Sequence, residues 1–163
     1  MPKLTHSGLY IPTASRPAVW DLKTLWLAHA TPWKAQVHLG GRRAATAECT
    51  GAEGAFPYLT DITPGRETEL EEHIAGCRRR GEEVDEGEWI DALVEEYETG
   101  SLLLALRLGE RLVRVRTPTG GTEYRQVRVP PGADVSAVVA ELFLPPGHRE
   151  LWTGHVWEPL NDK

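Results

Sequence analysis

Histidine and cysteine are the side chains of this chain that could ligate a metal or attack a substrate. His73 and Cys77 are four residues apart in a segment that we expect to be helical, so they would share one face of that helix. A zinc site usually needs four ligands in recognisable pairs, and Cys49 is the single other cysteine. The spacing therefore favours a half-buried histidine beside a small apolar cysteine. We expect no metal ion, no cofactor and no catalytic residue.

The C-terminal segment holds two more histidines, His148 and His155, close to Trp152 and Trp157. These side chains could line a pocket, and together with Cys49 the histidines are the candidates for a small hydrolytic enzyme. The apolar alternation of the segment is better explained by one strand that buries its tryptophans. We keep the enzyme as an alternative and favour a protein without catalytic activity.

Arginine is concentrated in the stretch with the clearest periodicity, residues 102–129. Two runs, Leu102–Leu108 and Arg111–Thr117, are joined by Gly109-Glu110, which is a hairpin signal. With a third run they predict an antiparallel core meander over residues 102–129. Directly opposed residues share a face of a sheet, so one face collects leucine and valine. The other face collects the residues that we call the arginine face: Arg107, Arg114, Arg116, Tyr124 and Arg128.

The second turn of the meander sets its register. A three-residue loop at Thr119–Gly121 places Val127 opposite Val113. After Pro130-Pro131 stops the strand, Asp134 is the predicted N-cap of a short helix. We expect the apolar stripe of that helix to cover the apolar face of the sheet.

Residues 67–98 hold thirteen aspartates and glutamates against three arginines, whereas the whole chain has a net charge of −6. The segment predicts two helices. The first follows Thr63-Pro64. The second begins at a capping box formed by Asp85 and Glu88 and ends at Gly100. Each helix should bury one side and expose carboxylates on the other. The candidate binding residues on these helices are Glu71, Glu72, Glu95 and Glu96.

The N-terminal part of the chain predicts a helix and a hairpin. Residues 1–14 have no clear period and are a candidate arm. A helix is predicted over residues 17–30, because apolar residues fall at helical spacing after a serine and a proline that signal a helix start. Residues 34–49 predict a hairpin around Gly40-Gly41. Together the elements predict an α+β fold, an antiparallel sheet with helices packed on one face, in a single domain of residues 1–163.

The composition excludes several classes of protein. With 40% hydrophobic and 26% charged residues, the chain should be soluble and globular. No apolar run approaches the roughly 20 residues of a membrane helix, and the N-terminus lacks the apolar core of a signal peptide. Two cysteines do not indicate a disulfide framework. We therefore expect a cytoplasmic or virion protein with no membrane partner.

The run Arg111–Phe143 (RLVRVRTPTGGTEYRQVRVPPGADVSAVVAELF) resembles the opening of β-grasp, ubiquitin-like domains, which share a hairpin, a P-x-G link and a following helix. The tail RELWTGHVWEPL is similar to the third strand and turn of that fold. The resemblance covers residues 111–157 and implies a binding module.

The leading hypothesis for function is a non-enzymatic protein-interaction or assembly subunit, for example in a multi-subunit particle such as a phage virion. It would bind protein, or itself, through the acidic helices or the arginine face. The first alternative is an inhibitor that mimics nucleic acid with the carboxylates of residues 67–98. Binding of nucleic acid by the arginine face, through phosphates and stacking on Tyr124, is less favoured because the chain is acidic.

Overall fold

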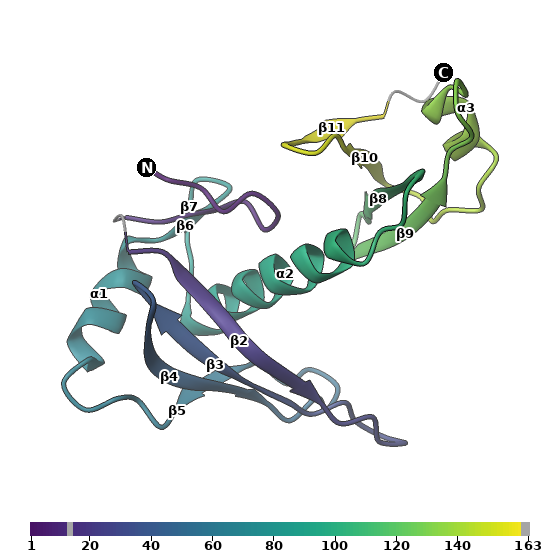
Figure 1. Ribbon diagram of the computed structural model, residues 1–163. Helices are drawn as coiled ribbons and strands as arrows, with labels where there is room; N and C mark the ends of the chain where they lie inside the picture. Colours follow the sequence, from purple (N-terminus) through teal and green to yellow (C-terminus); the bar gives the residue numbers. More distant parts are fainter. Residues whose placement is uncertain (13–14, 161–163) are drawn as a thin grey trace. The chain divides into compact units, whose positions relative to one another are not determined.

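The computed structural model describes residues 1–12 and 15–160. Its contacts group the chain into two compact units, unit 1 with residues 1–99 and unit 2 with residues 100–163. The structure combines helices with antiparallel sheets (Figure 1), which confirms the α+β class. The single domain stays a prediction. No helix in the described part of the chain has the length and apolar composition needed to cross a bilayer.

Unit 1 contains a four-stranded antiparallel sheet in the order β2-β3-β4-β5. The predicted hairpin over residues 34–49 is confirmed, with strands that pair from Trp33↔Cys49 to Leu39↔Arg42. Gly40 and Gly41 form its turn with φ angles of 63° and 79°, which glycine adopts without strain. The strands are β2 (Pro17–Thr24), β3 (Trp33–Leu39), β4 (Arg42–Cys49) and β5 (Tyr58–Thr60).

The predicted helix over residues 17–30 is wrong, because this segment forms β2 and the loop that leads to β3. A β-bulge follows Trp20 and adds a residue to the strand, and Asp21 in the bulge has a φ of 52°. Val19 and Leu22 consequently contact the core from positions three apart instead of two. A spacing of three is also typical of an amphipathic helix. The bulge therefore gave a strand the pattern of a helix.

Two helices arise from the acidic segment, as predicted. α1 spans Glu67–Gly76, and α2 begins at Glu86. The capping box is confirmed, since the backbone N–H of Glu88 donates to Asp85 Oδ1 at 2.8 Å and that of Asp85 donates to Glu88 Oε2 at 3.1 Å. A short hairpin between the helices consists of β6 (Arg78–Arg79) and β7 (Glu82–Glu83).

α2 spans Glu86–Leu104, so it continues past Gly100, its predicted end. The predicted strand Leu102–Leu108 is therefore wrong. A run of leucines without polar alternation fits a helix as well as a strand, and leucine is a good helix former. Extending a helix that already exists adds one hydrogen bond for each residue fixed, which is easier than starting a new strand.

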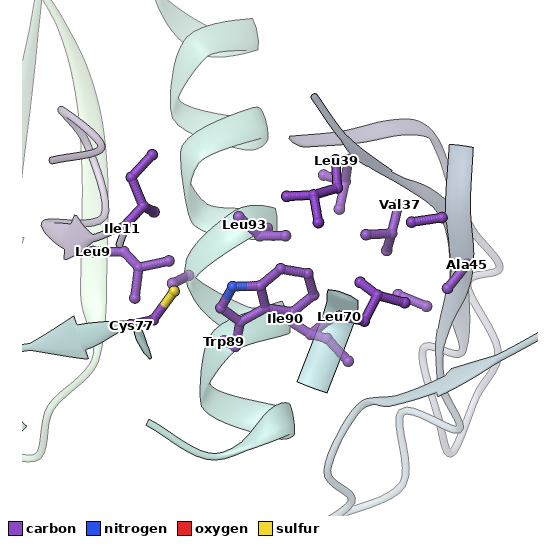
Figure 2. Packing of buried hydrophobic residues seen from close by; sticks show 14 of the residues in the cluster. Leu9, Ile11, Val37, Leu39, Ala45, Leu70, Cys77, Trp89, Ile90 and Leu93 are labelled. Carbon is purple, nitrogen blue, oxygen red and sulfur yellow. The ribbon is translucent and has the colours of Figure 1, made fainter. Parts of the chain in front are cut away.

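The core of unit 1 lies between the sheet and the two helices (Figure 2). Trp89 and Leu93 of α2 are fully buried in it. Residues 1–14, the candidate arm, contribute Leu4 and Leu9 to this core at 1% and 0% exposure. β1 (Leu9–Tyr10) also pairs with β6. The N-terminal segment is thus part of the unit 1 core, while residues 13–14 lie outside the described residues.

Unit 2 contains a second four-stranded antiparallel sheet, in the order β11-β10-β8-β9. Its helix α3 (Val135–Ala140) begins at the predicted cap, because Asp134 Oδ1 accepts from the backbone N–H of Ser136 at 3.1 Å. Val113, Val127 and Val139 form the core between α3 and the sheet. The strands are β8 (Glu110–Arg116), β9 (Thr122–Arg128), β10 (His148–Trp152) and β11 (Trp157–Pro159).

Two details of unit 2 differ from the sequence prediction. Val127 lies opposite Arg111 rather than opposite Val113, so the predicted register of the hairpin is wrong by two residues. A shift of two keeps every side chain on its predicted face, because side chains alternate with a period of two. The C-terminal segment forms two strands, β10 and β11, where one was predicted.

Candidate functional site

The structure brings most of the arginine face together in unit 2. Arg114 and Arg116 lie on β8, and Tyr124 and Arg128 lie on β9, with Arg114 directly opposite Tyr124. Arg107 does not join them, because it lies in the turn before β8, where its backbone N–H donates to Glu110 Oε2 at 2.8 Å. The alternation of the strands was therefore sufficient to group the first four residues.

The arginine face contains a buried cluster of charges. Arg114 Nε donates to Glu150 Oε2 at 2.6 Å, and Arg116 Nε lies 3.3 Å from the same oxygen. The guanidinium of Arg114 also lies 4.1 Å from the ring centre of Trp157, in a cation–π arrangement. Burial alone would raise the pKa of Glu150, but the hydrogen bond and charge of Arg114, with the charge of Arg116, lower the pKa overall. The cluster therefore holds β8, β10 and β11 together.

An aromatic row follows the same face. The ring centres of Tyr124 and Trp157 are 6.4 Å apart, and those of Trp157 and Trp152 are 5.4 Å apart. All three side chains are half-buried. The sequence pattern predicted that Trp152 and Trp157 lie on a strand, but it did not indicate Glu150, which pairs with the Arg114 guanidinium that lies over Trp157.

The four acidic candidates separate into two pairs with different surroundings. Glu71 and Glu72 are exposed on α1. Glu96 on α2 accepts hydrogen bonds from the backbone N–H groups of Thr5, His6 and Ser7 at 3.2, 2.8 and 2.9 Å. Glu95 forms an ion pair with Arg79 of β6. The second pair therefore holds the N-terminal segment and β6 against α2.

We expect Glu96→Ala to lower the free energy of unfolding of unit 1 by about 1–3 kcal/mol, because three backbone N–H groups lose a charged acceptor. Glu72→Ala is the matched control, since it makes the same change at an exposed helical position, and we expect it to alter stability by less than about 0.5 kcal/mol. Urea unfolding measures both. Hydrogen exchange of residues 4–11 should rise in Glu96→Ala alone. Equal effects of the two variants on stability would contradict the role of Glu96 in holding the N-terminal segment.

His73 and Cys77 are buried in unit 1, at 5% and 0% exposure. The ring of His73 meets Trp89 edge-on at 5.9 Å, and its Nε2 has no hydrogen-bond partner among the described residues. Burial lowers the pKa of His73 and raises that of the Cys77 thiol to about 11. The indole nitrogen of Trp89 is directed toward Cys77 (Figure 2). Both side chains are therefore packed in the core of unit 1, where burial disfavours their charged forms.

A further surface in unit 1 was not found by sequence analysis. α1 and α2 pack on one face of the four-stranded sheet, and the other face is largely solvent-accessible. Large apolar side chains remain on it, including Trp20 at 57%, Leu25 at 59% and Leu27 at 54% exposure. We call this surface the open face and define it by register and contacts as Trp20, Asp21, Lys23, Leu25, Leu27, Lys34, Gln36, Glu48 and Tyr58.

The apolar end of the open face lies on a hydrogen-bonded hairpin. The backbone N–H of Leu25 donates to Pro32 O at 2.8 Å, and that of Leu27 donates to Ala30 O at 3.0 Å. Gly51 supports the base of this hairpin, because a Cβ at Gly51 would overlap the carbonyl group of Thr31. The exposed leucines therefore belong to a structured hairpin that continues the β2–β3 ladder.

A groove of about 360 Å³ runs along this part of the sheet, with Leu25 and Pro32 on its walls together with Tyr58. Lys34 and Glu48, also in its lining, form an ion pair of 2.7 Å. A groove with aliphatic and aromatic walls and one ion pair suits contact with another protein surface. The sequence pattern did not indicate this surface, because it predicted a helix over residues 17–30, where the structure has β2 and a hairpin loop.

The described residues contain no group of three His, Cys, Asp or Glu side chains that could hold a metal ion. The enzyme candidates belong to different units: His148 and His155 are exposed in unit 2, and Cys49 is buried in unit 1 with its Sγ 3.9 Å from Ala55 O. Comparison of the chain with models of protein families, with curated proteins and with solved structures finds no match.

Proposed function

We propose that the chain is a non-enzymatic protein-interaction or assembly subunit that binds its partner through the open face of unit 1. The observation that supports this proposal is the exposure of Trp20, Leu25 and Leu27 on the sheet face opposite α1 and α2. The solvated face of an antiparallel sheet is ordinarily polar. Exposed apolar patches rimmed by polar residues mark interaction sites. A place in a multi-subunit particle such as a phage virion is consistent with this mode of binding.

The arginine face and the acidic helices support the same function less strongly than the open face does. Arg114 and Arg116 share Glu150, and Glu95 and Glu96 hold other parts of unit 1. A nucleic-acid mimic that depends on all four acidic candidates is therefore not favoured. The open face adds apolar side chains that are more than half exposed, at Trp20, Leu25 and Leu27.

A pull-down that compares matched variants tests the proposal. Leu25→Glu combined with Leu27→Glu places two charges on the open face, and Phe143→Glu makes the same kind of change at a fully exposed position of unit 2. We expect the unaltered chain and the Phe143 variant to retain the same partner from source-cell extract, and the double variant to lose it. Circular dichroism checks that each variant folds.

Two outcomes of these experiments would contradict the proposed function. Equal retention of the same proteins by all three chains would exclude the open face as the binding surface. A chain that retains no partner and stays monomeric in light scattering at high concentration would exclude the interaction role altogether.

A further inference from the structure

We infer that the partner bound by the open face is a second copy of this chain, packed face to face about a two-fold axis. This inference rests on the proposed function, because it names the partner of the same surface. It follows from the distribution of charge around the sheet of unit 1, from the size of the open face and from the order of its hairpin.

Charge on unit 1 is divided between the two sides of its sheet. The segment from residue 67 to 98, which includes α1 and most of α2, holds thirteen acidic residues against three arginines. Both helices pack on the face opposite the open face. Two copies that dock through their open faces therefore keep these acidic helices on the outside, with both sheets between them. Docking through any helical face would bring like charges together.

The open face itself carries both signs of charge. Lys23 and Lys34 lie on it together with Asp21 and Glu48. A two-fold interface brings the same patch of each copy into contact, so a patch with both signs is able to match itself. A strongly acidic partner would meet the two carboxylates, and a strongly basic one would meet the two lysines. A second copy is the occupant whose charges fit this surface best.

The dimensions of the face indicate a weak but specific dimer. The four strands hold eight, seven, eight and three residues, and together with the hairpin at residues 25–32 they give the face an area on the order of 500 Å², at about 3.3 Å per residue and about 4.8 Å between strands. Two copies would bury about 1,000 Å² in total, which is the lower limit for a specific interface. We therefore expect a dissociation constant in the micromolar range.

The hairpin at residues 25–32 is already ordered by hydrogen bonds at Leu25 and Leu27. Binding consequently costs little backbone entropy at the most apolar part of the surface. Two antiparallel sheets pack with their strands within about 30° of each other at a separation of about 10 Å. At that separation the leucines of one copy reach the sheet of the other.

Sedimentation equilibrium tests the inference with the full chain, from about 1 to 200 µM, a range that brackets a micromolar constant. We expect a monomer–dimer equilibrium in which Leu25→Glu weakens the dimer by about tenfold or more. Leu27→Ser, a milder change at the hairpin tip, should weaken it in the same direction. Phe143→Glu should leave it unchanged, because Phe143 lies outside the open face.

The salt dependence of the dimer dissociation constant is an independent test of the inference. Each copy has a net charge of −6, so the two copies repel each other at long range. Raising the ionic strength screens that repulsion, and we expect the dimer to tighten with added salt. A dimer held by the arginine face against the acidic helices would weaken instead.

Three results would overturn the inference: a monomer over the whole concentration range, a dimer that tolerates both leucine variants, or a dimer that Phe143→Glu dissociates. The chain could also stay monomeric and retain a different protein in the pull-down, which is lost when Leu25→Glu is combined with Leu27→Glu. That result would overturn the inference that the partner is a second copy, and the proposed function would stand. If the unaltered chain formed no dimer and retained no partner in the pull-down, the proposed function would be overturned as well.

Discussion

Glu150→Gln is expected to destabilise unit 2 by about 3–5 kcal/mol, because it removes the charge that compensates a buried guanidinium. The side chain of Arg114 is 6% exposed and that of Glu150 is 13% exposed. Glutamine has nearly the same shape, so packing is preserved while Arg114 stays charged without a carboxylate. Hydrogen exchange of β8 and β10 measures the loss in the unit where it arises.

The same sheet supplies a matched control on β9. Glu123 forms an ion pair with Arg125 at 3.3 Å, but both side chains are 47% exposed. We expect Glu123→Gln to cost less than about 0.5 kcal/mol, as exposed pairs usually do. If Glu150→Gln were no more costly than this control, the buried cluster would not stabilise unit 2.

Acidification provides a second measure of the same ion cluster. The pKa of Glu150 is lowered in the folded state by Arg114 and Arg116 against the effect of burial. The stability that this shift contributes is fully present above the unfolded pKa of about 4.3 and is lost as pH falls through the lower folded value. We expect the stability of unit 2 to fall more steeply below about pH 4.3 in the unaltered chain than in Glu150→Gln.

Trp89→Ala is expected to destabilise unit 1 by about 3–5 kcal/mol. Trp89 is fully buried, and it packs among Leu9, Leu93 and Cys77 at the centre of the unit 1 core (Figure 2). Truncation to alanine leaves a cavity that the surrounding sheet and helices fill only in part. Hydrogen exchange of the amides of β3 and α2 should rise accordingly.

Trp26→Ala makes the same substitution at a position that is 81% exposed. We expect it to change the stability of unit 1 by less than about 0.5 kcal/mol. Urea unfolding of the two variants side by side separates a packing role from the intrinsic effect of losing an indole. Similar unfolding midpoints would mean that Trp89 does not organise this core.

Several elements were predictable because their signals are local. The hairpin over residues 34–49 is specified by apolar runs around a glycine pair, and it formed as expected. The capping box of Asp85 and Glu88 and the cap of α3 at Asp134 also formed. Each of these signals is contained within a few residues of chain, so no distant contact is needed to interpret it.

The errors in fold arose where a local pattern was ambiguous. The bulge in β2 gave Val19 and Leu22 a helical spacing. The leucines after Gly100 fit either a strand or the continuation of α2. In both places the contacts of the whole unit select between two locally acceptable conformations, which is why the sequence pattern alone was insufficient.

The roles of the charged residues depend on partners far away in the chain. Alternation correctly put Arg114, Arg116 and Tyr124 on one face, and the helical pattern correctly put Glu96 on α2. Glu150 is 36 residues from Arg114, and Glu96 is 91 residues from Thr5. Whether a charge is compensated within the fold or left for a partner follows from such contacts.

Short stretches of sequence were enough to predict the α+β class, the β3–β4 hairpin, the pairing of β8 with β9 apart from its register, the acidic helices and the grouping of most of the arginine face. These features follow from local periods and caps. The tertiary structure alone decided that Arg114 and Glu96 are used internally and that Leu25 and Leu27 stay in solvent. Exposure and charge compensation depend on which distant segments meet, and no local pattern contains that information.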